Sequence, residues 1–194
     1  MRLPEPMVAG RKTERMSNAS FRMMLLFFDI IDFFYPHVAK RAKRFGIAEG
    51  MTVIDYGCGP GRYTVNFAAL VGERGKVYAL DIHDLAIETV RKRIARRNLR
   101  NVQPILIEGY NSSLPDETAD VVCAIDMFFV IKNPAAFLAE IKRIVKRTGN
   151  LVIDDGHQPR SVTKKKILES GLWDIFEETR DHLKCRPHEA SQEE

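Results

Sequence analysis

The chain has 194 residues, of which 45% are hydrophobic and 29% charged, and a formal net charge of +4 at pH 7. This length fits one α/β domain, and the composition is ordinary for a soluble globular protein. The three cysteines, Cys58, Cys123 and Cys185, are odd in number and far apart in the sequence. Cysteines in this number and spacing do not form a disulfide framework, and no two of them have the spacing of metal ligands. We therefore expect no metal site, and we expect the protein to be in the reducing cytoplasm.

The positive charge is concentrated in RKRIARRNLR (91–100) and KKK (164–166). This pattern is typical of solvated helix faces, and no aromatic-interleaved basic sheet or recognition module accompanies it. Nucleic acid is therefore not expected as the direct partner.

The N-terminal part begins with a polar, proline-containing segment, residues 1–16, which we expect to be flexible and to carry no export signal. The apolar stretch FRMMLLFFDIIDFFY (21–35) follows it. This stretch is shorter than the roughly 20 residues that a bilayer crossing needs, and three charged residues interrupt it, so no transmembrane segment is expected. Its helical period instead predicts a helix over 17–35, ended by Pro36.

A second, basic helix is predicted over 37–46, and from Met51 onward strand and helix patterns alternate. Strand patterns occur at 51–56, 76–82, 102–108, 119–126, 150–155, 173–180 and 181–187. Helical patterns occur at 62–72, at 84–98 with Asp84 as N-cap, at 134–147 and at 161–170. Apolar strands that alternate with helices indicate a parallel sheet covered on both faces. We therefore expect a Rossmann-like α/β fold with a seven-stranded, mostly parallel sheet and a C-terminal antiparallel hairpin. Its domain would span 47–187, between an N-terminal helical lid (17–46) and a disordered tail (188–194).

The stretch VIDYGCGPGRYT (53–64) begins within the first predicted strand and carries Gly57, Gly59 and Gly61 at alternate positions just after it. In an open α/β sheet, ligands bind beyond the carboxyl ends of the strands, where this loop would lie. A phosphate-binding P-loop would need Gly-Lys-Ser/Thr where the chain has Gly-Arg-Tyr. The dinucleotide fingerprint would need a glycine in place of Arg62. Both phosphate-binding interpretations therefore fail.

Two acidic residues favour a different cofactor. Asp55 places a negative charge beside the loop, which would repel a pyrophosphate but suits a ligand with an ammonium and a sulfonium group. Asp81 lies at the end of the second strand, where a carboxylate can accept both hydroxyls of a ribose. Together with the glycine turn, these charges indicate S-adenosylmethionine (SAM) rather than NAD.

These residues also carry a family resemblance. The chain resembles the class I SAM-dependent methyltransferases over three stretches. They are VIDYGCGPGRYT, KVYALDIHDLAIETVRKR and LPDETADVVCAIDMFFVIKNPAAFLAEIKRIVKRTGNLVIDDG. Within that class they are most similar to the small ubiquinone/menaquinone-type branch, over about residues 17–186. The resemblance implies that 47–187 is a SAM-binding domain and that S-adenosylhomocysteine is the product.

The resemblance also implies where the cofactor is bound. Residues of the glycine loop would line its methionine end, Asp81 would hold the ribose, and Ile82 would pack on the adenine. The full set expected to bind the cofactor is Asp55, Tyr56, Gly57, Cys58, Gly59, Gly61, Tyr63, Asp81, Ile82, Glu108, Gly109, Tyr110 and Asp126. Relatives often have an aspartate where this chain offers Glu108 to Tyr110, so either Glu108 or a backbone carbonyl would accept the adenine amino group.

Methyl transfer from a sulfonium needs alignment and exclusion of water more than a catalytic triad. If a general base assists, the candidates are Asp126, which borders the sulfonium, and His157, which follows the fifth strand. The apolar helix over 21–35 and the MFF stretch (127–129) favour a small hydrophobic acceptor, although packing in the core would also explain Phe128 and Phe129.

Several alternatives stay open on the sequence alone. The helix over 21–35 could roof the site, form a homodimer face or contact a membrane surface peripherally. The basic helices leave open an RNA or protein methyltransferase. A SAM-binding protein without catalysis is a further alternative.

Overall fold

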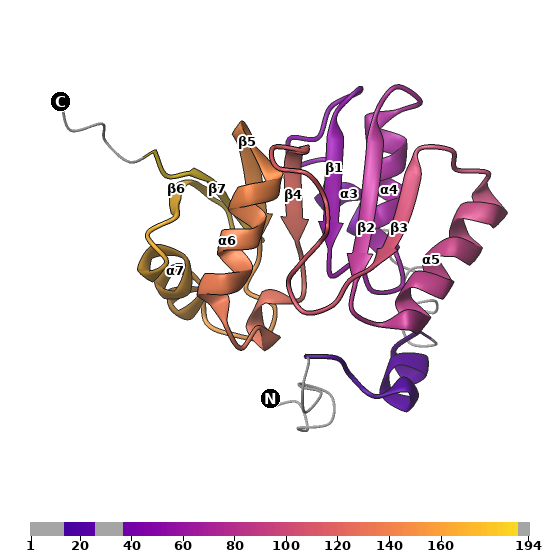
Figure 1. The fold of residues 1–194 in the computed structure, drawn as a ribbon, viewed down its shortest axis with the longest axis horizontal. Coiled ribbons are helices and arrows are strands. Elements are labelled where there is room, and N and C mark those ends of the chain that lie inside the picture. Colours follow the sequence, from indigo (N-terminus) through magenta and orange to yellow (C-terminus); the bar gives the residue numbers. More distant parts are fainter. Residues whose placement is uncertain (1–13, 26–36, 190–194) are drawn as a thin grey trace.

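The structure is a computed structural model that describes residues 14–25 and 37–189. Its centre is a seven-stranded sheet with the strand order β3-β2-β1-β4-β5-β7-β6 (Figure 1). Strands β1 to β5 pair in parallel, whereas β7 is antiparallel to both β5 and β6. The strands are β1 (Thr52–Tyr56), β2 (Lys76–Asp81), β3 (Val102–Leu106), β4 (Ala119–Ala124), β5 (Val145–Ile153), β6 (Trp173–Glu178) and β7 (Leu183–Pro187). The predicted Rossmann-like sheet and its C-terminal hairpin are confirmed.

Helices cover both faces of this sheet, with α6 on one face and α3 and α4 on the other (Figure 1). The helices are α3 (His37–Ala42), α4 (Arg62–Val71), α5 (Asp84–Arg97), α6 (Pro134–Ile144) and α7 (Arg160–Glu169). A 3-10 turn, η1 (Phe128–Val130), follows β4. None of the helices in the described residues is long and apolar enough to cross a membrane.

The two-residue period of β1 divides the core between the two faces. Ile54 and Tyr56 are buried in the cluster on the α6 side, and the ring of Tyr56 meets the ring of Phe137 edge-on at 5.1 Å. Val53 points the other way, into the cluster that contains Phe67 of α4. Because every β1 side chain after Thr52 is buried, the strand is held on both faces, and the loop that follows it starts from a rigid base.

One predicted helix end and one predicted helix cap are wrong. The helix predicted over 134–147 ends at Ile144, because Val145 pairs with Ala119 and enters the sheet as the start of β5. Asp84 is not the N-cap of α5. The cap is His83, whose ring Nδ1 accepts the backbone N–H of Leu85 at 3.2 Å. Asp84 instead lies in the first turn, where a carboxylate also suits the helix dipole.

The expected lid region, 17–46, divides into parts with different surroundings. Residues 18–25 are helical and lie beyond the carboxyl ends of the parallel strands (Figure 1). The remainder of the helix predicted over 17–35 falls on residues 26–36, outside the described residues. Residues 37–46 pack behind the sheet against α4, with Val38, Ala42 and Phe45 in its core cluster.

Candidate functional site

A cavity lies where the carboxyl ends of β1, β2 and β4 meet. Most of the residues predicted to bind the cofactor line it, namely Asp55, Tyr56, Gly57, Cys58, Gly59, Tyr63, Asp81, Ile82, Gly109, Tyr110 and Asp126. The parallel strands bring them together because their carboxyl ends share one edge of the sheet. Gly61 and the exposed Glu108 lie outside this lining.

The Asp81 carboxylate is oriented by the backbone around it. Its Oδ2 accepts the N–H of Gly59 at 2.8 Å, and its Oδ1 accepts the N–H of His83 at 2.8 Å. Burial raises the pKa of Asp81 to about 6, against the effect of these hydrogen bonds, which lower it. The backbone N–H of Ile82 also lowers the pKa of Asp81 through a hydrogen bond, and an ionised carboxylate with about four acceptor positions still retains acceptor capacity for a ligand. This geometry suits the two hydroxyls of a ribose.

Asp55 provides a second buried carboxylate, only 3% exposed, beside the loop after β1. Its Oδ2 accepts the hydroxyl of Thr64 at 2.5 Å, which fixes it against the first turn of α4. Burial raises the pKa of Asp55 to about 7, the Thr64 hydrogen bond opposes this shift, and the charge of Asp81 adds to it. A cationic ligand in the cavity would favour the ionised form of both carboxylates.

Gly59 and Gly61 have different structural roles in the loop. Gly59 has a φ of +51° and lines the cavity, and a Cβ added there would meet nothing within 4 Å. Gly61 has a φ of +80°, and an added Cβ would lie 2.9 Å from Cγ2 of Val90 on α5. Gly59 therefore leaves room for a ligand to approach the backbone, whereas Gly61 lets α4 pack closely against α5.

The loop after β3 closes another side of the cavity through Tyr110. The hydroxyl of Tyr56 donates to the backbone carbonyl of Tyr110 at 2.6 Å, and the Tyr110 ring packs against Phe137. The side chain of Glu108 is exposed, so of the two expected acceptors for an adenine amino group, a backbone carbonyl of this loop is better placed.

The loop after β4 contributes both polar and apolar groups. Asp126 lines the cavity with a φ of +58°, and its backbone N–H donates to Oδ1 of Asp154 at 2.9 Å. Phe129 also lines the cavity, whereas Phe128 is fully buried in the core. His157 is exposed and packs edge-on against Phe129 at 4.9 Å, outside the cavity lining.

Glu14, Arg15, Met16 and Phe21 line the cavity as well, although the sequence indicated a flexible segment up to residue 16. The Glu14 carboxylate accepts the hydroxyl of Tyr110 and the backbone N–H of Lys132, the latter at 2.5 Å. Arg15 pairs with Asp84 at 2.5 Å, and Phe21 stacks on His83 with ring centroids 4.4 Å apart. The polar composition of 1–16 gave no signal for these contacts, since each partner lies more than sixty residues away.

The three cysteines are free and buried. Burial, together with nearby carboxylates, raises the pKa of the Cys58 thiol, so it lines the cavity as a neutral group. Within residues 14–25 and 37–189, no group of three or more His, Cys, Asp or Glu side chains could hold a metal ion.

Residues 47–188 match the family model described as a methyltransferase domain. Demethylmenaquinone methyltransferase from Geobacillus sp. (strain WCH70) is 30% identical over 128 residues, which cover 64% of this chain and 53% of that protein. A ubiquinone/menaquinone biosynthesis C-methyltransferase from Shewanella pealeana is 26% identical over 144 residues, which cover 73% of this chain and 57% of that protein. The chain thus spans a little over half the length of these curated relatives.

The crystal structure of a SAM-dependent methyltransferase from Aquifex aeolicus superimposes with a TM-score of 0.66 at 28% identity. The match covers 77% of this chain and 88% of that one. This chain therefore belongs to the methyltransferase-domain family, and its fold is that of a class I SAM-dependent methyltransferase. Within that class it is similar to methyltransferases of ubiquinone and menaquinone biosynthesis.

Proposed function

We propose that this enzyme transfers the methyl group of SAM to a ring carbon of a small, hydrophobic, hydroxylated aromatic acceptor of the quinol type. The observation that carries the proposal is the apolar part of the cavity lining. Met127, Phe129 and Ile131 from the loop after β4 belong to it, as do Phe21 and Met24 from the N-terminal helix. The names of the curated relatives support a quinone-type ring as the acceptor.

The residues around the cavity fit SAM, and we propose a role for each polar group. Asp81 would accept hydrogen bonds from the ribose hydroxyls. Asp55 would supply the negative charge near the ammonium and sulfonium groups, and the backbone at Gly59 would lie against the ligand. When bound, SAM supplies a methyl group on a sulfur that is a good leaving group.

In the proposed reaction, a bond forms between the ring carbon and the methyl carbon while the bond between sulfur and methyl breaks. The ring carbon then loses its hydrogen as a proton, so one proton is released for each methyl group transferred. A hydroxyl on the ring makes this carbon nucleophilic when it hydrogen-bonds to, or loses its proton to, a base. We propose Asp126 as that base, in preference to the exposed His157.

The helix at residues 18–25 would act as a lid that excludes water from the cavity. Its inner side chains Phe21 and Met24 line the cavity, whereas Met23 is 60% exposed. We further propose that the enzyme acts in the cytoplasm on a small molecule and not on nucleic acid.

Two measurements test the proposed function. In calorimetry, SAM and S-adenosylhomocysteine should bind while NAD should not, and Asp81→Ala should weaken SAM binding by about 1–3 kcal/mol. With labelled SAM, label should then appear on a 1,4-dihydroxynaphthalene that carries a short prenyl chain and is kept reduced. Binding of NAD in place of SAM, or labelling of RNA or protein from an extract but never of the ring, would refute the proposal.

A further inference from the structure

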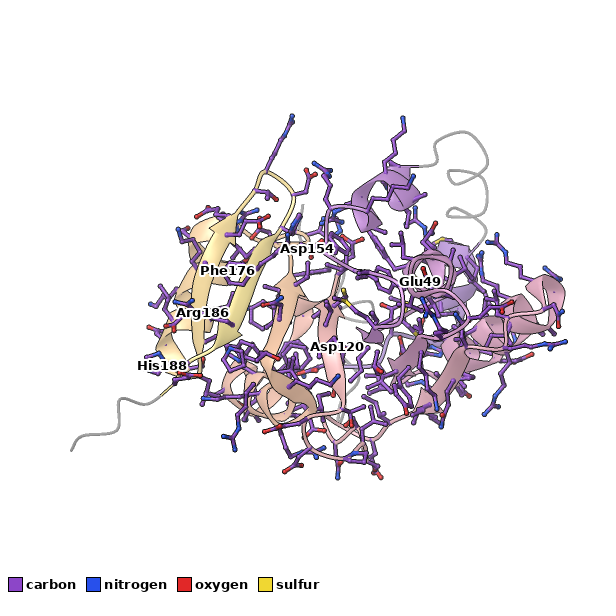
Figure 2. All side chains as sticks on the ribbon, turned by 90° about the horizontal axis from the view of Figure 1, so that it is seen from above. Glu49, Asp120, Asp154, Phe176, Arg186 and His188 are labelled. Carbon is purple, nitrogen blue, oxygen red and sulfur yellow. The ribbon has the colours of Figure 1, made fainter. Side chains whose placement is uncertain are left out.

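One guanidinium group joins four segments beside the cavity residues Tyr63 and Asp126. Arg41 of α3 donates from Nη2 to Oδ2 of Asp154, just after β5, and to the backbone carbonyl of Asp181, just before β7, both at 2.6 Å. From Nη1 it donates to the hydroxyl oxygen of Tyr63 on α4 at 2.8 Å. Figure 2 shows Asp154 between the β6–β7 hairpin and α3. The Arg41 side chain is only 16% exposed, so these contacts are shielded from solvent.

The hydrogen bond from Arg41 determines what the Tyr63 hydroxyl can do. A guanidinium keeps its protons and has no acceptor, so the Tyr63 oxygen must be the acceptor in this pair. The hydroxyl proton of Tyr63 is then directed away from Arg41, and Tyr63 itself lines the cavity. Burial raises the pKa of Tyr63 far above neutrality, against the effect of the Arg41 charge. Tyr63 therefore keeps its hydroxyl proton as a hydrogen-bond donor that Arg41 does not use.

The same cluster fixes Asp126 as an acceptor. A non-glycine residue at a φ of +58° is strained, and the bond from its N–H to Asp154 holds it there. The Asp126 side chain is 55% exposed, and its Oδ1 lies 3.8 Å from Nη1 of Arg41. The Asp126 carboxylate and the Tyr63 hydroxyl oxygen thus lie beside the same guanidinium nitrogen, Nη1 of Arg41.

We propose that Arg41 and Asp154 are positioning residues that hold this pair at the acceptor end of the cavity, where the pair recognises two oxygens on one ring. Asp126 accepts a ring hydroxyl, and Tyr63 donates to a second ring oxygen, either a hydroxyl or a carbonyl. This inference rests on the proposed function and deepens it, because it requires an acceptor with two oxygens and not merely an apolar one.

The test measures binding to the protein loaded with S-adenosylhomocysteine, so it does not depend on turnover. Two probes are compared by calorimetry: the prenylated 1,4-dihydroxynaphthalene and the same prenylated naphthalene without hydroxyls. Wild type should bind the diol at least about tenfold more tightly than the deoxygenated ring, as expected for two added hydrogen bonds, one of them to a carboxylate. Tyr63→Phe, which removes one oxygen only, should reduce this preference severalfold and leave the affinity for S-adenosylhomocysteine within about twofold.

Arg41 is tested with a matched control. Arg41→Lys keeps the charge but loses the fork that reaches Tyr63 and Asp154 together. Arg41→Lys should reduce the preference for the diol by about as much as Tyr63→Phe does. A variant with both substitutions should lose little more of this preference than either single variant. Arg44→Ala removes an exposed arginine two residues beyond α3 that pairs with Asp181, and it should leave the preference unchanged.

Two results would overturn the inference. One is a wild type that binds the two probes equally. The other is a Tyr63→Phe variant that keeps the preference for the diol but binds S-adenosylhomocysteine much more weakly, which would assign Tyr63 to the cofactor. A failure to methylate the ring, with the binding preference intact, would count against the proposed function only.

Discussion

At the scale of single residues, the site uses backbone geometry to orient charge. Asp81 is held by the N–H groups of Gly59 and His83, so its position depends on the same turn that makes room for the ligand. This arrangement couples the shape of the glycine loop to the direction of the carboxylate. A change at Gly59 should therefore disturb cofactor binding in two ways, through lost space and through a displaced hydrogen bond.

Gly59 and Gly61 provide a matched pair of substitutions for this idea. In Gly59→Ala, the methyl group would occupy open space in the cavity and the backbone would be strained by about 1–2 kcal/mol. We expect SAM to bind at least about tenfold more weakly, which corresponds to about 1.4 kcal/mol. In Gly61→Ala, the methyl group would collide with Val90, so the main loss should be in the free energy of unfolding.

Urea unfolding and calorimetry on both variants separate these effects. The expected order is a larger loss of stability for Gly61→Ala and a larger loss of SAM affinity for Gly59→Ala. The assignment of the two glycines is wrong if Gly59→Ala binds SAM as wild type does.

At the scale of elements, the N-terminal segment is tied to the body of the enzyme on both sides of the cavity. Glu14 reaches the loops that carry Tyr110 and Lys132, whereas Arg15 and Phe21 contact the start of α5. The Phe21 ring is only 2% exposed. A bound ligand in the cavity would lie beneath this segment, so we expect its release to require that the segment lifts.

Phe21→Ala tests this expectation, with Met23→Ala as control on the same helix. Loss of the stacking on His83 removes about 0.5–1.5 kcal/mol beyond the loss of buried area. We therefore expect SAM to dissociate roughly three to ten times faster from Phe21→Ala, as measured by stopped-flow displacement. Met23 is exposed, and its replacement should leave the rate unchanged. Equal rates in both variants would show that the segment does not retain the ligand.

At the scale of the whole molecule, cofactor binding, protonation and stability are linked. Burial raises the pKa of Asp55 to about 7 and of Asp81 to about 6 in the free protein. Because an unfolded aspartate titrates near 3.8, the free protein gains stability from these groups as the pH falls from about 7 toward 3.8. Bound SAM favours the ionised forms instead. The contribution of bound SAM to the free energy of unfolding should therefore decrease as the pH falls from about 7 toward 3.8.

The measurement is urea unfolding with and without SAM at pH 7.5 and at pH 5.5. With SAM at about 100 times its dissociation constant at pH 7.5, the free energy of unfolding should rise by about 2.7 kcal/mol. At the same SAM concentration and pH 5.5, the increase should be clearly smaller, because both carboxylates must first lose a proton. Asp81→Asn should show a weaker dependence on pH. An increase that is the same at both pH values would contradict the assigned roles of Asp55 and Asp81.

Much of the fold and part of the site follow from local patterns. The alternation of apolar strands with helices predicts the sheet, because each pattern reports burial within a few residues of itself. The glycine turn and the two aspartates lie at strand ends, and parallel strands place those ends together, so the cofactor could be inferred without coordinates. The boundary between α6 and β5 could not be inferred from local patterns, because the pairing of Val145 with Ala119 joins residues distant in the sequence.

By itself, the sequence of this protein determined its class of fold and its cofactor, and it predicted the edge of the sheet where we expect that cofactor to bind. Only the tertiary structure decided which glycine lines the cavity and which packs against Val90, and that Glu14 and Phe21 also line the cavity. It alone brought Arg41, Tyr63 and Asp154 into one cluster beside Asp126. The physical reason is that hydrogen bonds and packing act between atoms a few ångströms apart, and in these cases the chain brings together residues more than twenty positions apart in sequence.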